Sequence, residues 1–220
     1  MKHPPAIALA ELEQDALTEL LNIGVSYAAA SLRNMIGHQV FLSVPAVSII
    51  TRERAAQIVG ERENDKLVAV HQAFDGDISG RALLIFPETN SLELVRAVTG
   101  GDLPLEDIIE LEQEALAETG NIILNGCLAT IANQLQRSLK MSLPEIVRGS
   151  GPDVFGVSSA PDPEDVVLFL FINFSVNERD IRGYIAMLMD LPALTSLKAL
   201  LRKFIHRTTG EVQLTHYAPI

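Results

Sequence analysis

The chain has 220 residues, of which 48% are hydrophobic, so it is long enough and apolar enough to bury a substantial core. Its formal net charge of −11 argues against nucleic acid and anionic membrane as partners, because phosphate groups are bound by clustered Lys and Arg. A single cysteine, Cys127, excludes an intramolecular disulfide, and we find neither a secretory leader nor a long uncharged apolar run. We therefore expect a soluble, cytoplasmic protein without a membrane span.

Residues 11–36 are predicted to form an amphipathic helix, because their apolar residues recur with helical spacing. Asp15, Glu19 and Asn22 share the face opposite the apolar stripe, and Gly37 marks the expected end of the helix. The stripe consists of Leu17, Leu20, Leu21, Gly24, Ala28, Leu32 and Met35.

The rest of the first half is predicted to be mostly strand. Apolar, β-branched runs indicate strands at residues 39–50, 66–73 and 77–86, and a further helix is expected at 91–99. Gly100, Gly101 and Asp102 then mark a short joint, since nothing there is long or of low complexity.

The second half follows the same plan. A helix is predicted at 107–136, with Glu114, Glu118 and Asn121 opposite an apolar stripe that includes Cys127. Strands are expected at residues 140–147, 165–174 and 181–189, followed by a helix at 194–205. We assign no structure to residues 208–220.

The two halves are related by an offset of 99 residues. The predicted fold class is therefore α+β, with duplicated helix–strands–helix halves in pseudo-twofold symmetry and a sheet covered by long helices. Residues 1–220 are expected to form a single domain of two repeats, about 11–100 and 107–208. Seven identities carry the alignment of the two long helices: Ala16/Ala115, Leu17/Leu116, Glu19/Glu118, Asn22/Asn121, Ile23/Ile122, Ala30/Ala129 and Asn34/Asn133.

Searches for common catalytic and metal motifs find none. The histidines are scattered and a lone cysteine cannot complete a zinc site, so we expect no metal or cofactor bound by the chain itself. There is no phosphate-binding glycine loop and no nucleophile elbow. Cys127 lies on the apolar stripe, which favours a buried small hydrophobe over a nucleophile.

A four-position motif remains, and it occurs twice. Each copy has an acidic residue, then Glu four positions later, Asn three positions after that, and Pro 23 positions further on. A Glu and an Asn spaced in this way are neighbours on a helix surface, where the carboxylate can anchor a cation and the carboxamide can hold a water. A carboxamide cannot take a proton at neutral pH, so any catalysis here would be positional, with the electrostatics supplied elsewhere. The copies are Asp15, Glu19, Asn22 and Pro45, and Glu114, Glu118, Asn121 and Pro144.

An alternative is that these residues are ordinary solvated positions on amphipathic helices. Against it, Asn has a weaker helix propensity than Ala, Glu or Lys, yet it occurs in the middle of both helices.

Both copies resemble the signature of the CheC/FliY/CheX chemotaxis phosphatases, and with its two copies the chain most resembles CheC. The resemblance implies hydrolysis of the phosphoaspartate of CheY-like response regulators. It implies that Glu19 and Glu118 pair with a receiver lysine, and that Asn22 and Asn121 orient the attacking water. The Mg²⁺ is implied to come with the phosphorylated receiver, and Pro45 and Pro144 are expected to shape the chain after each helix.

Each copy departs once from the family pattern. The first position is usually Asp or Ser, which Asp15 fits and Glu114 does not. A Gly often precedes the Asn, which Gly120 fits and Leu21 does not. A non-catalytic adaptor that binds a receiver or the deamidase CheD stays open as an alternative function, as does a purely structural role.

Overall fold

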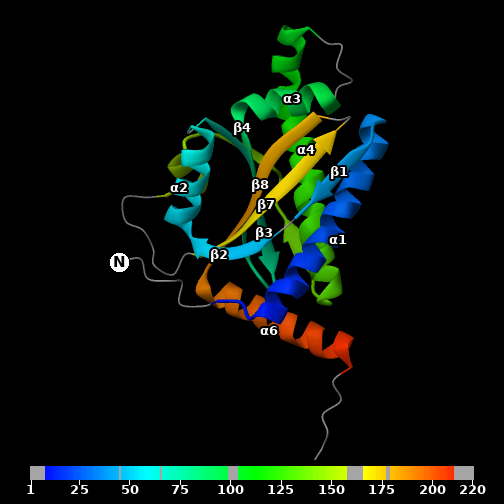
Figure 1. The fold of residues 1–220 in the computed structure, drawn as a ribbon, viewed down its shortest axis with the longest axis vertical. Coiled ribbons are helices and arrows are strands. Elements are labelled where there is room, and N and C mark those ends of the chain that lie inside the picture. Colours follow the sequence, from blue (N-terminus) through cyan, green and yellow to red (C-terminus); the bar gives the residue numbers. More distant parts are fainter. Residues whose placement is uncertain are drawn as a thin grey trace, which may run out of the picture.

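A computed structural model describes residues 8–44, 46–64, 66–98, 104–157, 166–176 and 179–210 (Figure 1). The elements in chain order are α1 (Glu11–Ile36), β1 (Val40–Ser43), β2 (Val47–Thr51), α2 (Arg52–Glu63), β3 (Leu67–Gly76), β4 (Gly80–Pro87), α3 (Glu88–Val98), α4 (Leu105–Gln134), β5 (Leu139–Met141), β6 (Glu145–Gly149), α5 (Gly151–Phe155), β7 (Val166–Val176), β8 (Arg179–Met189) and α6 (Leu191–Thr209).

The strands form one antiparallel sheet, and the two halves of the chain interleave in it. The order is β1-β7-β8-β4-β3-β5, with β2 also paired to β7 and β6 to β3. The short strands of each half therefore pair with the long hairpin of the other half. β4 and β8 join the two hairpins, from Arg81 opposite Leu188 to Ile85 opposite Tyr184. Neither half holds a complete sheet by itself.

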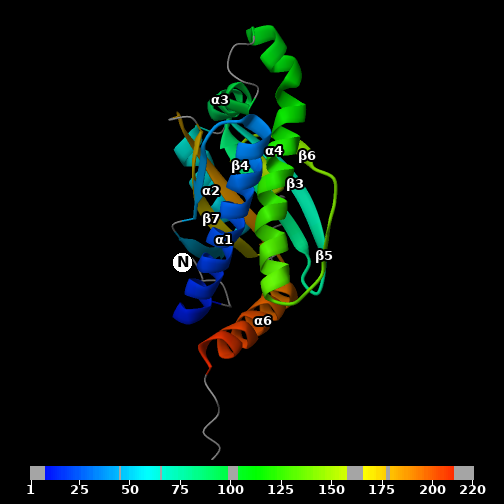
Figure 2. The same ribbon diagram turned by 90° about the vertical axis from the view of Figure 1, so that its right-hand side faces the viewer.

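Helices cover both faces of the sheet. The long helices α1 and α4 lie side by side on one face, with α6 crossing beneath them in Figure 2. They enclose the larger of two hydrophobic cores, to which α3 and α6 also contribute. The short helices α2 and α5 pack on the opposite face over the smaller core. The α+β class is confirmed, and so is a cover of long helices, on one face of the sheet.

The sequence located most of these elements. The helix expected at 11–36 coincides with α1, and the apolar stripe is buried except for Met35. The strands expected at 39–50 and 140–147 are each two short strands, because the chain leaves the sheet before Pro45 and before Pro144. Helices α2 and α5 were not predicted. The order of elements is the same in both halves, while duplication of an ancestral unit stays a prediction.

Pro45 and the joint at Gly100, Gly101 and Asp102 lie outside the described residues, as does most of 208–220. The division into repeats stays a prediction. One helical segment, Leu111–Gln134 of α4, meets the length and composition of a membrane span, with a mean hydropathy of 1.2. More than half of that window is buried inside the fold, as in the core helix of a soluble protein.

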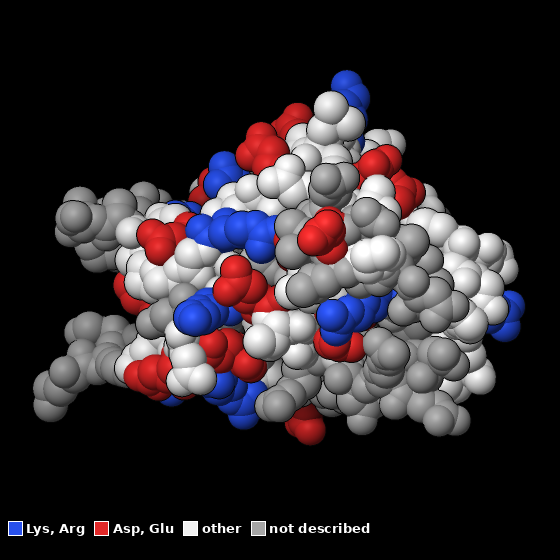
Figure 3. Space-filling model, turned by 90° about the horizontal axis from the view of Figure 1, so that it is seen from above, with Lys and Arg blue, Asp and Glu red and all other residues white. Residues whose placement is uncertain are grey.

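Acidic residues outnumber basic ones in the chain, but they do not form a continuous acidic surface at the α3 end of the molecule (Figure 3). Figure 3 looks down on the α3 end of the molecule, where acidic and basic side chains are interspersed among the coloured residues. The formal charge of −11 therefore does not act there as a field of one sign.

α1 and α4 approach each other closely where both have glycine. A Cβ on Gly24 would lie 2.8 Å from the Cα of Cys127 and 2.9 Å from the carbonyl oxygen of Gly126. A Cβ on Gly126 would lie 3.0 Å from the Cβ of Ala28. Backbone atoms cannot rotate away as a side chain can, so a larger residue at Gly24 would push the helices apart.

An ion-paired carboxylate fastens α6 to the start of α1. Glu13 is only 3% exposed. One of its oxygens accepts from Nε of Arg202 at 2.6 Å, and the other accepts from the backbone N–H of Ala10 at 2.8 Å and lies 3.6 Å from Nζ of Lys198. Burial raises the pKa of Glu13, but these three partners outweigh it and hold the pKa below its ordinary value of 4.5.

We expect Gly24→Ala to lower the free energy of unfolding by about 1–3 kcal/mol, because the methyl group meets the α4 backbone. In an uncrowded helix the same change stabilises by about 1 kcal/mol, so the sign of the change in unfolding free energy distinguishes a crowded position from an uncrowded one. Urea denaturation measures it. Ser31→Ala, at an exposed position of α1, is the matched control and should change stability by less than about 0.5 kcal/mol. A stabilising Gly24→Ala would contradict the close crossing.

Glu13→Gln should destabilise the protein by about 1–3 kcal/mol at neutral pH, because the buried ionic contacts to α6 are lost. The folded-state pKa of Glu13 is depressed, so its contribution is complete above pH 4.5 and is lost as pH falls through the folded-state value. The difference in unfolding free energy between wild type and Glu13→Gln should therefore shrink as the pH is lowered below 4.5. A constant difference in denaturation series across that range would argue against the ionised role.

Candidate functional site

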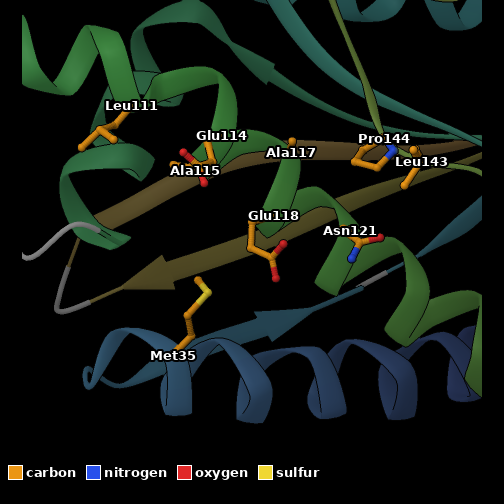
Figure 4. Close-up of a pocket in the computed structure, with 9 residues that line it drawn as sticks. All are labelled: Met35, Leu111, Glu114, Ala115, Ala117, Glu118, Asn121, Leu143 and Pro144. Atoms are coloured by element: carbon orange, nitrogen blue, oxygen red, sulfur yellow. The ribbon is translucent and has the colours of Figure 1, made fainter.

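The second copy of the motif lines a surface cavity of about 680 Å³ (Figure 4). All four motif residues contribute to it, together with residues from the end of α1 and from the β5–β6 connection. The lining consists of Met35, Leu111, Glu114, Ala115, Ala117, Glu118, Asn121, Leu143 and Pro144. The structure thus brings the polar trio of α4 and the distant Pro144 together at one cavity.

The trio stands on successive turns of α4. Glu114 and Glu118 are exposed and Asn121 is half-buried. The preceding residue, Gly120, lets this turn lie directly on β3, since a Cβ there would be 2.6–2.7 Å from the side chain of Val70. The close approach brings Asn121 within hydrogen-bonding distance of residues on the strand.

Two other amides hold the Asn121 carboxamide. Its Oδ1 accepts from Nε2 of Gln72 on β3 at 2.9 Å and from Nδ2 of Asn125, one helical turn further along α4, at 2.8 Å. The same Gln72 nitrogen also donates to the backbone carbonyl of Ser142 at 3.1 Å. A carbonyl can only accept, so this bond identifies the Gln72 donor and thereby the Asn121 oxygen. Among the residues that the structure describes, Nδ2 of Asn121 has no partner and is available to a ligand.

Figure 4 shows Nδ2 of Asn121 on the side of the carboxamide that faces Glu118, which lines the same cavity. The site therefore presents two carboxylates and one amide donor over a short stretch of helix. Carboxylates of this kind suit a cationic group, and the N–H₂ can donate to a water or to an anionic oxygen.

The β5–β6 connection, which forms one side of the cavity, is hydrogen-bonded to β3. Ser142 and Ala73 exchange hydrogen bonds: the Ala73 N–H donates to the Ser142 hydroxyl, and the Ser142 N–H donates to the Ala73 carbonyl, both at 2.9 Å. The next residue, Leu143, is 86% exposed and forms part of the cavity rim.

The first copy of the motif is arranged differently. Nδ2 of Asn22 donates to the carbonyls of Thr18 at 3.0 Å and Val44 at 2.9 Å, and its Oδ1 accepts from the Val44 N–H at 2.9 Å. Both amide hydrogens are therefore already bonded within the chain. Val44 is 1% exposed, so the β1–β2 connection lies against α1 here.

The sequence predicts that the polar trio of each helix lies on the outward face. Asp15, Glu19, Glu114 and Glu118 are exposed there, whereas Asn22 and Asn121 are half-buried. The Asn22 carboxamide ties α1 to the strand connection, because the backbone of Val44 offers both a donor and an acceptor. Glu114 does not close the second site, since it lines the cavity.

Two other buried side chains have strongly shifted pKa values. Cys127 is fully buried, and burial raises the pKa of its thiol to about 12, so it is not available as a thiolate. Burial, together with the charge of Arg81, lowers the pKa of His71 to about 4. Across the residues that the structure describes, no group of three or more His, Cys, Asp or Glu could hold a metal ion.

Sequence reasoning missed Gln72 and Asn125. Gln72 carried a usable signal: on β3 the residues Val68, Val70 and Phe74 face the larger core, and Gln72 is the polar residue at the same phase. It is 1% exposed. A buried polar side chain in an apolar row needs a partner, which here is Asn121. Asn125 gave no signal beyond its spacing of four from Asn121.

Comparisons with known proteins point to one family. Residues 68–161 match the family model described as chemotaxis phosphatase CheX, a stretch that contains Gln72 and the whole second motif. The CheY-P phosphatase CheC of Bacillus subtilis is 25% identical over 66% of this chain and 69% of its own. The flagellar motor switch phosphatase FliY of the same species is 23% identical over 96% of this chain, which spans only 54% of FliY.

Among solved structures, FliY of Thermotoga maritima has the same fold, with a TM-score of 0.68 at 17% identity over 90% of this chain and all of that chain. The sequence matches, the motif and the fold together make the chain similar to the CheC/FliY/CheX chemotaxis phosphatases.

The two asparagines should differ in their effect on stability. Asn22→Ala leaves the buried Val44 N–H without its partner, so we expect it to lower the free energy of unfolding by about 1–3 kcal/mol. Asn121→Ala leaves Gln72 bonded to Ser142 and should cost less than about 1 kcal/mol. Urea denaturation midpoints compare the two variants directly, and equal losses would show that Asn22 is not the tie described here.

Proposed function

We propose that this protein hydrolyses the phosphoaspartate of a CheY-like receiver and that the second motif is its working site. One observation carries the proposal: Nδ2 of Asn121, beside Glu118 in an open cavity, has no hydrogen-bond partner among the described residues, while Nδ2 of Asn22 is bonded to the backbone of Thr18 and Val44. The names of the relatives support the reaction class, since CheC of Bacillus subtilis is named a CheY-P phosphatase.

In this proposal Glu118 anchors the receiver through its active-site lysine. A lysine ammonium is a compact charge with three donors, and an exposed carboxylate at the edge of a cavity can accept from it with little desolvation. Glu114, one turn away in the same cavity, adds a second negative charge that favours the approach of a cation.

Asn121 then acts on the nucleophile. Its Nδ2 would donate to the oxygen of a water and hold that oxygen in line with the acyl phosphate, leaving a lone pair directed at phosphorus. The receiver would supply the Mg²⁺ and the charge stabilisation, so this chain would need no cofactor of its own. Glu19 and Asn22 form the matching copy, which we propose to be the weaker one because both Asn22 amide hydrogens are occupied.

Phosphate release from a phosphorylated CheY-like receiver of the same organism tests the proposal. Wild type should accelerate release. Asn121→Ala should lose about 100-fold of that acceleration, because positioning one reacting group is worth this much. Asn22→Ala, assayed where it is fully folded, should change the rate by less than about threefold. A rate that depends on Asn22 and not on Asn121 would reverse the assignment.

Binding separates the anchor from the water-positioning role. Glu118→Lys should weaken receiver affinity by about tenfold or more, because the partner lysine would meet like charge. Glu61→Lys makes the same charge change on exposed α2, across the sheet, and should leave affinity unchanged. Receiver binding without any acceleration of release by wild type would favour an adaptor and overturn the phosphatase proposal.

A further inference from the structure

Gln72 occupies a position where an apolar side chain would pack at no polar cost. Its neighbours on the same face of β3, Val70 and Phe74, belong to the larger core. On β7, the corresponding long strand of the second half, the buried residues of that face are Leu168, Leu170 and Ile172, all apolar. Among the described side chains, a buried amide is therefore found on β3, below the second motif, and not on the same face of β7.

The amides that hold Asn121 are themselves incompletely satisfied. Oε1 of Gln72 and Oδ1 of Asn125 are both buried without a hydrogen-bond partner among the described residues. A pair of orphaned carbonyl oxygens destabilises the fold, so the arrangement calls for a reason other than stability. Both nitrogens of these amides point at the same atom, Oδ1 of Asn121.

We infer that Gln72 is a positioning residue, assisted by Asn125, that locks the Asn121 carboxamide with its nitrogen turned into the cavity. A free carboxamide rotates and presents its oxygen and its nitrogen in turn. Two donors on Oδ1 leave one orientation, because an amide nitrogen turned toward them would place donor against donor. The link from Gln72 to the Ser142 carbonyl sets which end of Gln72 faces Asn121.

The consequence for catalysis rests on the proposed function, whereas the orientation itself does not. A donor fixed in the cavity can hold the oxygen of a water, and the enzyme need not select that orientation when the receiver docks. Gln72 would thus influence the rate of the chemical step and not the affinity for the receiver, since it is not itself one of the residues that line the cavity.

Gln72→Met tests the inference, because methionine has a similar shape and no donor. Nuclear magnetic resonance of the side-chain amides, with the Asn121 signal assigned from Asn121→Asp, reports orientation without any substrate. We expect the Asn121 NH₂ to be rigid in wild type and to become mobile in Gln72→Met, with the denaturation midpoint unchanged. The maximal rate of phosphate release should fall about tenfold at an unchanged half-saturating receiver concentration. Gln113→Met, at an exposed position of α4, is the matched control and should alter neither readout.

Gln72→Glu adds a signature that a structural role would not give. A buried carboxyl has a raised pKa, and in its protonated form it can donate to Oδ1 of Asn121 as Gln72 does. Once ionised it can only accept, which turns the amide over. The rate of Gln72→Glu relative to wild type should therefore fall as pH rises, while that of Gln72→Met relative to wild type should not depend on pH.

The outcomes separate the two proposals. An Asn121 amide that stays rigid in Gln72→Met overturns the inference, whatever happens to the rate. A mobile amide with an unchanged rate overturns its catalytic part. A mobile amide in a protein whose wild type releases no phosphate leaves the positioning in place and removes the proposed function.

Discussion

The close crossing of α1 and α4 is the constraint on which the rest of the structure depends. Glycines at Gly24 and Gly126 let the two backbones meet, so both helices can lie on one face of the sheet with the larger core beneath them. Gly120 has the same effect between helix and sheet, because the absence of a Cβ lets α4 pack directly on Val70 of β3. Helix–helix and helix–sheet spacing together decide which polar atoms can reach each other. The Gln72–Asn121 bond forms because these glycines bring α4 close to the strand.

The two copies of the motif show how equal spacing can give unequal chemistry. The amide in each copy is similarly placed on its helix, and each copy is followed by a strand connection that contains proline. One connection lies against its helix and binds Asn22 through the Val44 backbone. The other pairs with Ala73 of the neighbouring strand and leaves Asn121 to Gln72. What differs is the partner that each carboxamide finds, and a family signature does not specify it.

The sequence predicted the long helices, the hairpins and the motif well, because each has a strong local pattern. α2 was missed because its buried side is built from Ala55, Ala56 and Gly60 with Val59, too few large apolar residues to show a helical stripe. The sequence predicts one continuous strand at 39–50 because the apolar run continues through Val44. The strand pairing, however, stops after Ser43 and resumes at Val47. The bond from Asn22 to Val44 and that from Gln72 to Asn121 join residues 22 and 49 positions apart, so no helical period reveals them. Local pattern thus predicts the candidate site, and tertiary contacts determine which asparagine amide is already bonded within the chain.

The interleaved sheet has a consequence for how the chain folds as it is made. β1 and β2 have no strand to pair with until β7 exists, more than a hundred residues later. The β3–β4 hairpin can form early, but β4 needs β8 to complete its second edge. Pairing between strands so far apart in the sequence requires closing a large loop. The entropy cost of that closure comes before the stabilising contacts form, which slows folding. During synthesis the first half must wait with an exposed strand edge, and it is the emergence of β7 and β8 that sets the moment of native assembly.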